Sequence, residues 1–264
     1  MTEWVPVRTT AQIRAAERVL LDQGVPLMLW AAQCLASITA DELVEAGVTR
    51  DGGGRRLPGT DGGPIVGRVL VLAGAGDNGG DALYAAAALL QWMPQRAASA
   101  HPPADDLRID VFCTSERVHE QALATALAGG ARRIDLAQVA ADAAEYDIVI
   151  DGILGIGVST DPALRGAARD VVSVLLPHVR AGRPRVIAAD VPSGLHPDLG
   201  ATSDDVVLPA SVTVTFGGLK PGLVTRRGRA LSGAIVFVDF DLPFDEPPAT
   251  SDWVAYAVAG RPAS

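Results

Sequence analysis

The chain has 264 residues, 48% of them hydrophobic and 20% charged, so it can bury a sizeable core as one large domain or two small ones. Its formal net charge of −9 argues against nucleic acid or an anionic membrane as a partner, because binding to phosphates needs a basic surface. Cys34 and Cys113 lie far apart and form no C-x-x-C, which argues against a disulfide framework or a structural zinc site and favours a reducing, cytoplasmic setting. The uncharged stretch 23–40 contains polar residues and lacks a basic flank, so we expect neither a signal peptide nor a membrane span.

The first part of the chain is predicted to be helical. Over residues 9–24, threonines precede a pattern with apolar residues on one helical face, and a glycine ends it. A second helix is expected from about Leu27. Thr39 and Glu42 have the spacing of a capping box, which predicts a short third helix that Gly47 ends.

Two segments lack a regular pattern. Residues 47–67 hold eight glycines and two prolines, which predicts a mobile insertion. Residues 243–264 are rich in proline near their start and weakly patterned, which predicts a tail or the remnant of a linker. We therefore expect one domain in the whole chain 1–264, with its core at about 9–242.

Between these segments, strands and helices alternate. Helices are expected at 82–92, 116–128, 136–144 and 165–179, where they can serve as crossovers between parallel strands. The connections shorten after residue 186, so the last strands are expected to form an antiparallel or mixed edge. The pattern predicts an α/β fold, a three-layer αβα sandwich. Its strands are expected at 69–72, 109–113, 148–150, 186–189, 212–216 and 235–238.

The stretch VLVLAGAGDNGGDAL predicts a strand, a glycine-rich turn and a helix, with backbone amides free at the helix N-terminus. Gly74, Gly76 and Gly79 have the G-x-G-x-x-G spacing of a dinucleotide-binding turn. The next strand does not end in the acid that binds ribose in such folds, which argues against a dehydrogenase. Instead Asn78 and Asp81 stand in the turn itself. A glycine-rich turn with a capping aspartate is the alternative interpretation.

Two further predicted strands end in polar residues. Asp151 closes one strand before a loop that contains Gly155, and Asp190 closes another before a turn that contains Ser193. Because ligands of parallel sheets bind at the carboxyl ends of the strands, we expect Asp81 to meet these residues in one crevice. Carboxylate, amide and hydroxyl oxygens suit a hard cation, and a carboxylate at the rim can act as an acid or base.

Four motifs in this order, AGAGDNGGDAL, DGILGIGVSTD, DVPSGL and SVTVTFGGLKPGL, resemble those of the YjeF N-terminal domain family, the NAD(P)H-hydrate epimerases. The resemblance covers about residues 9–242. It implies a Rossmann-like, mostly parallel αβα sandwich with a helical N-terminal extension. It also implies an isomerase that interconverts the R and S forms of hydrated NADH and NADPH, a bound potassium ion, an NAD(P)H-hydrate dehydratase as functional partner, and a homodimer.

The resemblance also assigns site residues. The cation ligands it implies are Asn78, Asp151 and Ser193. Lys220, the only lysine in the chain, matches the lysine of the family's T-F-x-x-x-K segment. The substrate-binding positions it implies are Asp77, Asn78, Gly79, Gly80, Asp81, Gly155, Ile156, Gly157, Val158, Ser159, Thr160, Asp161, Asp190 and Lys220.

The chemistry of such a hydrate needs an acid and a base. Protonating the ring hydroxyl lets the ring nitrogen expel water as an iminium forms, and re-addition from the other face inverts the carbon. Neighbouring carboxylates would stabilise the cationic intermediate. We predict that Asp190 carries this proton transfer.

Four positions depart from the family pattern. Asp77 stands where an asparagine is usual, Ala82 replaces a glycine, and Leu29 and Trp30 replace two polar residues. These departures favour the alternative that the chain is a catalytically impaired nucleotide-binding or interaction protein of the same fold.

Overall fold

The computed structural model describes residues 2–45, 67–97, 107–157, 161–245 and 253–257. Its centre is a seven-stranded sheet in the order β4-β3-β2-β5-β6-β7-β8. The strands are β2 (Gly67–Ala73), β3 (Leu107–Cys113), β4 (Arg132–Arg133), β5 (Ile148–Gly152), β6 (Arg185–Ala189), β7 (Val212–Phe216) and β8 (Ala234–Val238). Each predicted strand is confirmed, with ends extended by one or two residues where they differ.

Every pairing between neighbouring strands of this sheet is parallel. The prediction of an antiparallel or mixed edge is therefore wrong. The chain returns from β6 to the start of β7 through a long irregular segment, and from β7 to β8 through two short helices, α7 (Pro221–Val224) and α8 (Arg226–Ser232). A parallel crossover needs enough chain to recross the sheet, and that chain need not form a long helix.

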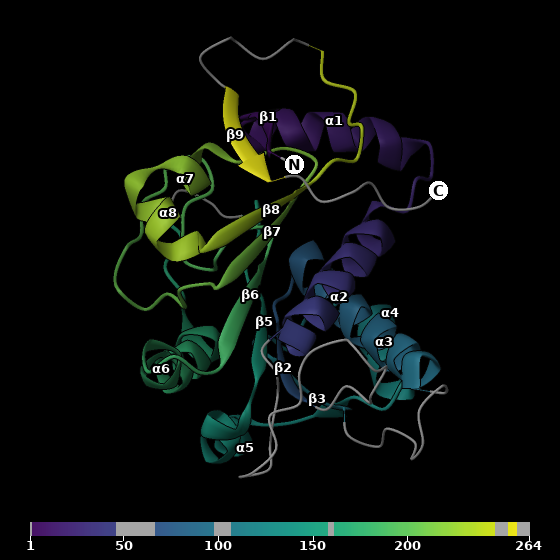
Figure 1. Cartoon of the computed structure of the whole chain (residues 1–264), viewed down its shortest axis with the longest axis vertical. Helices are drawn as coiled ribbons and strands as arrows, with labels where there is room; N and C mark the ends of the chain where they lie inside the picture. Colours follow the sequence, from purple (N-terminus) through teal and green to yellow (C-terminus); the bar gives the residue numbers. More distant parts are fainter. Residues whose placement is uncertain (1, 46–66, 98–106, 158–160, 246–252, 258–264) are drawn as a thin grey trace.

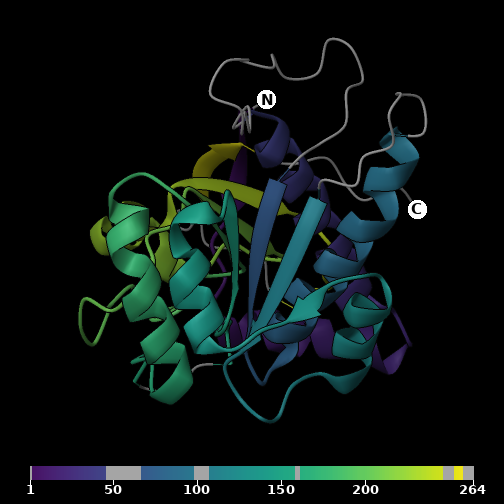
Figure 2. The same cartoon turned by 90° about the horizontal axis from the view of Figure 1, so that it is seen from below.

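Helices cover both faces of the sheet, as Figure 1 shows edge-on and Figure 2 from below. One face carries α2 (Leu27–Glu45), α3 (Asp77–Ala97) and α4 (Glu120–Ala128). The other carries α5 (Leu136–Asp142), which runs into the short helix η1 (Ala143–Glu145), and α6 (Gly166–Arg180). The three-layer αβα sandwich is confirmed.

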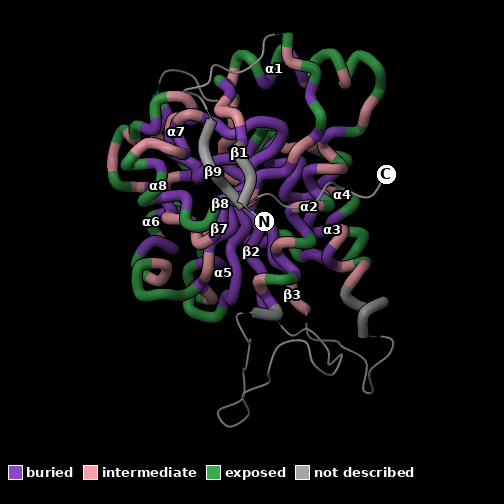
Figure 3. Tube along the Cα trace, turned by 45° about the horizontal axis from the view of Figure 1, so that its top comes forward, coloured by how far each residue is buried: buried purple, intermediate pink, exposed green. Residues whose placement is uncertain are grey.

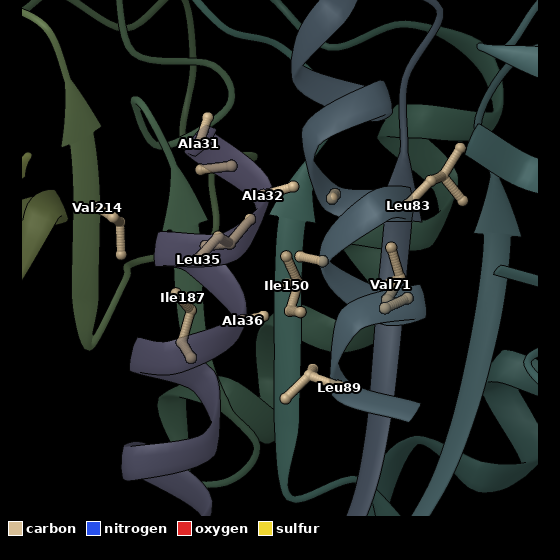
Figure 4. Close-up of a cluster of buried hydrophobic side chains, with 14 of the residues drawn as sticks. Ala31, Ala32, Leu35, Ala36, Val71, Leu83, Leu89, Ile150, Ile187 and Val214 are labelled. Atoms are coloured by element: carbon tan, nitrogen blue, oxygen red, sulfur yellow. The ribbon is translucent and has the colours of Figure 1, made fainter. Parts of the chain in front are cut away.

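The layers follow from the alternation of side chains along the strands. In β2, Val69 and Val71 pack under α2 and α3, whereas Leu70 and Leu72 belong to the cluster under α5 and α6. Figure 4 shows the first cluster, in which Leu35 of α2 lies among the strand side chains. Because both faces are covered, the strands are apolar on both sides, and Figure 3 shows them buried between more exposed outer helices.

Three predicted helix boundaries are wrong. α4 begins at Glu120, four residues after its predicted start at 116. α2 is one helix of 19 residues, and Thr39 lies inside it with its hydroxyl donating to the Leu35 carbonyl at 2.7 Å, so it caps no third helix. The predicted end at Gly47 lies outside the described residues, as does most of the predicted insertion 47–67, of which only Gly67 is described, at the start of β2. α3 begins at Asp77 and not near residue 82, because the glycines at positions 79 and 80 belong to its first turn.

The chain ends carry elements that the sequence pattern missed. β1 (Thr2–Pro6) pairs antiparallel with β9 (Trp253–Ala257), which lies inside the segment predicted to be a tail. Such a pairing brings the first and last parts of the described chain side by side, as Figure 1 shows.

The predicted N-terminal helix is confirmed as α1 (Thr10–Asp22). Thr9 and Gln12 form a capping box at its start, and the backbone N–H and hydroxyl of Thr10 donate to the Asp198 carboxylate at 2.8 and 2.7 Å. Asp198 follows β6 in the chain, so this contact ties α1 across the carboxyl ends of the strands. Within the described ranges no single helix is long and apolar enough to cross a membrane, although α1 and the following helix, bent by 113°, would qualify together by length and composition.

Candidate active site

A cavity of about 850 Å³ lies at the carboxyl ends of the strands. Its walls come from α1, the start of α2, the turn between β2 and α3, the loop after β5 and the end of β6. Ligands of parallel α/β proteins bind at this edge of the sheet. The acidic and amide side chains in the walls are Glu17, Asp22, Asp77, Asn78, Asp81 and Asp190.

Glycines allow the β2–α3 turn to pack against the loop after β5. A Cβ atom at Gly74 would lie 1.9 Å from the Ile153 carbonyl oxygen, and one at Gly79 would lie 2.2 Å from the Gly74 carbonyl oxygen. The backbone N–H groups of Gly79 and Gly80 both donate to the Gly76 carbonyl, at 3.0 and 3.3 Å. Fewer amides are therefore free for a ligand than the glycine pattern predicts.

The three predicted cation ligands lie in one chain of hydrogen bonds. Asp151, 1% exposed, accepts from the Ser193 hydroxyl at 2.6 Å and from the Ser193 N–H at 2.9 Å. The Leu154 N–H donates to the Ser193 hydroxyl at 2.9 Å, and the Leu154 carbonyl accepts from Asn78 Nδ2 at 3.1 Å. Burial raises the pKa of Asp151, and its hydrogen bonds with Ser193 offset part of that rise. No described lysine or arginine is bonded to this carboxylate.

Asp190 has an unusual backbone conformation, and its carboxylate is bonded to a buried lysine. Its φ is 65°, in the left-handed region that few residues other than glycine adopt. Lys220, 1% exposed, donates through Nζ to Asp190 Oδ1, to the Thr215 hydroxyl at 3.1 Å and to the Phe216 carbonyl at 2.8 Å. The Thr215 hydroxyl and the Phe216 N–H also contact Oδ1, each at 3.3 Å. All described hydrogen bonds go to Oδ1, which leaves Oδ2 available to a ligand in the cavity.

Asp81 has a different environment. It lies in the second turn of α3 and is buried, and the described part of the chain offers its carboxyl group no hydrogen bond or ion pair. Burial raises the pKa of Asp81 well above its ordinary value, and the carboxylates of Asp190 and Asp77 raise it further. Both effects favour the neutral, protonated form of Asp81.

Glu17 of α1 is a site residue that the sequence reasoning missed. Burial raises its pKa to about 7, while Lys220 and Asp190 act on it in opposite directions. The helical spacing in the sequence could have indicated it. Glu17 lies four residues after Ile13 and directly after Ala16, which form the buried face of the helix, so its side chain belongs next to that face.

The remaining predicted substrate positions divide into three groups. Gly155, Ile156 and Gly157 line the cavity. Gly79 and Gly80 are buried in the first turn of α3. Lys220 does not line the cavity itself but donates to Asp190, which does. The positions Val158, Ser159 and Thr160 lie outside the described residues.

Asp161 is not brought to the cavity. Its carboxylate accepts from the Ser203 hydroxyl and pairs with Arg165 on the surface, and the Ser203 hydrogen bond lowers its pKa.

Two of the positions that depart from the family pattern, Leu29 and Trp30, do not line the cavity. Leu29 is 44% exposed. Trp30 packs edge-on against Phe240, with 6.1 Å between the ring centroids.

The fold and this cavity define an α/β sandwich protein with an acidic ligand site at the carboxyl ends of its parallel strands. Residues 25–222 match the family described as "YjeF-related protein N-terminus", and the chain belongs to this family. It is 49% identical to a protein named NAD(P)H-hydrate epimerase from Microbacterium testaceum, over 91% of this chain and 80% of that one. A protein of the same name from Clavibacter sepedonicus is 44% identical over 88% of this chain and 89% of that one.

Two further similarities are more distant. A protein named bifunctional NAD(P)H-hydrate repair enzyme Nnr, from Mycobacterium tuberculosis, is 36% identical over 72% of this chain, which corresponds to 34% of that protein. The crystal structure of yeast YNL200c superposes with a TM-score of 0.64 at 18% identity, covering 94% of this chain and 98% of that one. The second similarity supports the fold.

Proposed function

We propose that this protein is an isomerase that interconverts the R and S forms of hydrated NADH and NADPH. One observation carries the proposal. In a chain 49% identical to a protein named NAD(P)H-hydrate epimerase, a cavity at the strand ends brings the Asp190 carboxylate, with Oδ2 available, together with the buried acid Asp81. Acid and base groups in one cavity are what loss and re-addition of a ring hydroxyl require.

The proposed reaction needs no change of oxidation state. An acid protonates the hydroxyl on the ring carbon next to the ring nitrogen, the C–O bond breaks as the nitrogen lone pair forms the iminium, and water leaves. Water then adds to the opposite face and gives a proton to a base. We assign the base in one direction to Asp190, because Lys220 and Thr215 hold its Oδ1 and leave Oδ2 directed to other partners. Carboxylates around the cavity favour the cationic intermediate.

The proposal includes a monovalent cation, with potassium as the expected ion, held by Asn78, Asp151 and Ser193. The described residues contain no group of three or more His, Cys, Asp or Glu side chains that could hold a metal ion. An ion here would bind one carboxylate together with amide, hydroxyl and carbonyl oxygens, which suits a hard cation of low charge. The residues fit, because Asp151 is buried and bonded to no described basic group. When bound, the cation would supply that missing positive charge and neutralise the carboxylate.

The test of the proposed function is a direct assay. Purified protein is mixed with chromatographically pure R-hydrate, and formation of the S-form is followed with the spontaneous rate subtracted. Accelerated approach to the same equilibrium mixture is expected. A rate equal to that of heat-denatured protein would contradict the proposal and favour the alternative, an impaired binding protein. The positions of Leu29 and Trp30 outside the cavity wall remove one reason for that alternative.

The proposed partner is an NAD(P)H-hydrate dehydratase, which would consume the epimer that this protein supplies. Relatives named bifunctional repair enzymes, of which this chain matches 34% and 42%, support the pairing. A homodimer and a cytoplasmic location are part of the same proposal, and light scattering of the purified protein tests the first.

A further inference from the structure

Glu17 and Asp190 line the same cavity but belong to different elements of the fold. Glu17 lies on α1, which crosses beyond the carboxyl ends of the strands in Figure 1, whereas Asp190 ends β6 within the sheet. The contact between Thr10 and Asp198 fixes the start of α1, and Arg14 donates to the Ile156 carbonyl across the cavity. Both contacts precede Glu17 in the chain, so they fix the first half of the helix that carries it.

The side chain of Glu17 is less exposed than those of its charged neighbours on the helix. Arg14, Glu17 and Arg18 all line the cavity, but the two arginines are exposed whereas Glu17 is intermediate. Its carboxyl group takes part in no hydrogen bond or ion pair among the residues that the structure describes. A carboxyl group without a protein partner, facing a cavity, is free to bond to a ligand.

The charges that face Glu17 come from each element around it. Asp77 and Asp81 of α3 and Asp190 at the end of β6 oppose its ionisation, while Arg14 and the buried Lys220 favour it. Burial dominates, and the pKa of Glu17 rises to about 7. About half of the molecules then carry a proton on this carboxyl group at neutral pH, which is the condition for efficient proton transfer in either direction.

We propose that Glu17 is a second acid–base group of this cavity, which serves one face of the nicotinamide ring while Asp190 serves the other. The inference rests on the proposed epimerase function. Inversion at one carbon removes a hydroxyl from one face of the ring and adds a hydroxyl to the opposite face. Each face therefore needs its own acid–base group.

The proton balance closes without a further reactant. Protonated Glu17 gives its proton to the ring hydroxyl, the C–O bond breaks and the nitrogen lone pair forms the iminium. Water adds from the Asp190 side and gives its extra proton to that carboxylate. One proton has moved from Glu17 to Asp190, and exchange with solvent restores the starting state. In the reverse direction the two groups exchange roles.

The first experiment compares the purified wild-type chain with Glu17→Gln. Gln resembles the protonated carboxyl in size, so we expect the variant to fold. Turnover is expected to fall by roughly 10² to 10⁴, and by the same factor in both directions, because the equilibrium between the epimers is unchanged. Glu116→Gln, an exposed position outside the cavity, is the matched control and should keep the wild-type rate.

The pH dependence supplies a second readout. In the wild type, kcat/KM is expected to fall about tenfold per pH unit above pH 7 as Glu17 loses its proton. In Glu17→Gln this fall should disappear. Glu17→Asp keeps the ionisable group, so it should retain a fall at alkaline pH with an intermediate rate, and it tests the inference even if the Gln variant does not fold.

Oxygen exchange separates a chemical role from a structural one. In ¹⁸O-labelled water, Glu17→Gln should still introduce label into the hydroxyl of one epimer through the Asp190 side, while label in the other epimer falls to the spontaneous rate. Labelling of both epimers at the wild-type ratio, or a wild-type rate and pH profile in both variants, would overturn the role of Glu17 alone. A wild-type protein that does not accelerate epimerisation would overturn the proposed function and this inference together.

Discussion

Buried charged residues gather in two regions of the same sheet, and they are paired differently. Near Arg68 at the start of β2, Asp110 of β3 is fully buried. It accepts from Arg132 Nε and Nη2 at 2.9 and 2.7 Å and from the Tyr146 hydroxyl at 3.1 Å. Asp147 accepts from the Arg68 N–H at 2.7 Å and pairs with an arginine. We call these residues, Arg68, Asp110, Arg132, Tyr146 and Asp147, the amino-end network.

The cavity at the carboxyl ends has the opposite arrangement. Asp190 has the Lys220 ammonium, but Glu17 and Asp81 have no described ion pair with a basic side chain. Asp151 does not line the cavity, and it has no described ion pair either. Burial raises the pKa of Asp110 as well, but there the arginines and the tyrosine hydroxyl act against it. Carboxyl groups whose burial is left uncompensated are costly to stability and are typical of sites that bind ligands or move protons.

The largest expected effect is that of Asp190→Asn, which removes the base and should lower turnover by roughly 10² to 10⁴. The variant also leaves the Lys220 ammonium buried without its partner, so we expect a loss of about 3–5 kcal/mol in the free energy of unfolding. Adding Lys220→Met should recover stability but not turnover. A wild-type rate in Asp190→Asn would assign the proton transfer to Asp81 or Lys220 instead.

The matched change in the amino-end network is Asp110→Asn. It should lower the free energy of unfolding by about 2–4 kcal/mol, because the buried Arg68 and the bidentate Arg132 lose their shared carboxylate. Epimerisation per folded molecule should stay at the wild-type rate. Denaturant unfolding and the R-hydrate assay measure the two quantities, and a selective loss of turnover would show that the two regions are not separate in function.

Removing potassium should affect the carboxyl ends of the strands and not the amino-end network. If the ion binds at Asp151, replacing it with tetramethylammonium should lower stability by about 1–3 kcal/mol, because an ion that binds only the native state stabilises it by mass action. Asp151→Ala should show no such response, whereas Asp110→Asn should keep it. Identical melting temperatures of the wild type in both salts would argue against a cation site.

The smallest effect is expected for Asp77→Asn. Asp77 lines the cavity at the start of α3, where its charge opposes the diphosphate of the proposed ligand. Removing that charge should tighten binding by up to about tenfold, which corresponds to ~1.4 kcal/mol. Isothermal titration with the hydrate measures this, and unchanged or weaker binding would indicate that the carboxylate faces the cation or solvent.

Much of the fold followed from local patterns. Apolar runs of three to five residues with helical segments between them specify a covered parallel sheet, and the acids that end those runs must meet at one edge because parallel strands end together. For this reason the approach of Asp81 and Asp190 to one cavity, and the contact between Asp151 and Ser193, could be predicted without a structure. Asp151 and Ser193 are not among the residues that line that cavity. Glycine has a low helix propensity, so the glycines in the first turn of α3 were predicted to be part of a loop. The predicted start of this helix is therefore too late in the chain.

The sequence by itself determined the layers, the strand ends and the main acids of the site, since these depend on periodicity and on the order of residues along each strand. The tertiary structure alone decided which acid meets a base and which does not. The Asp190–Lys220 pair joins residues 30 positions apart, and the environment of Glu17 depends on α1 folding back over strand ends that come much later in the chain. Burial and pairing set the charge of a carboxyl group, and both are properties of contacts between distant segments.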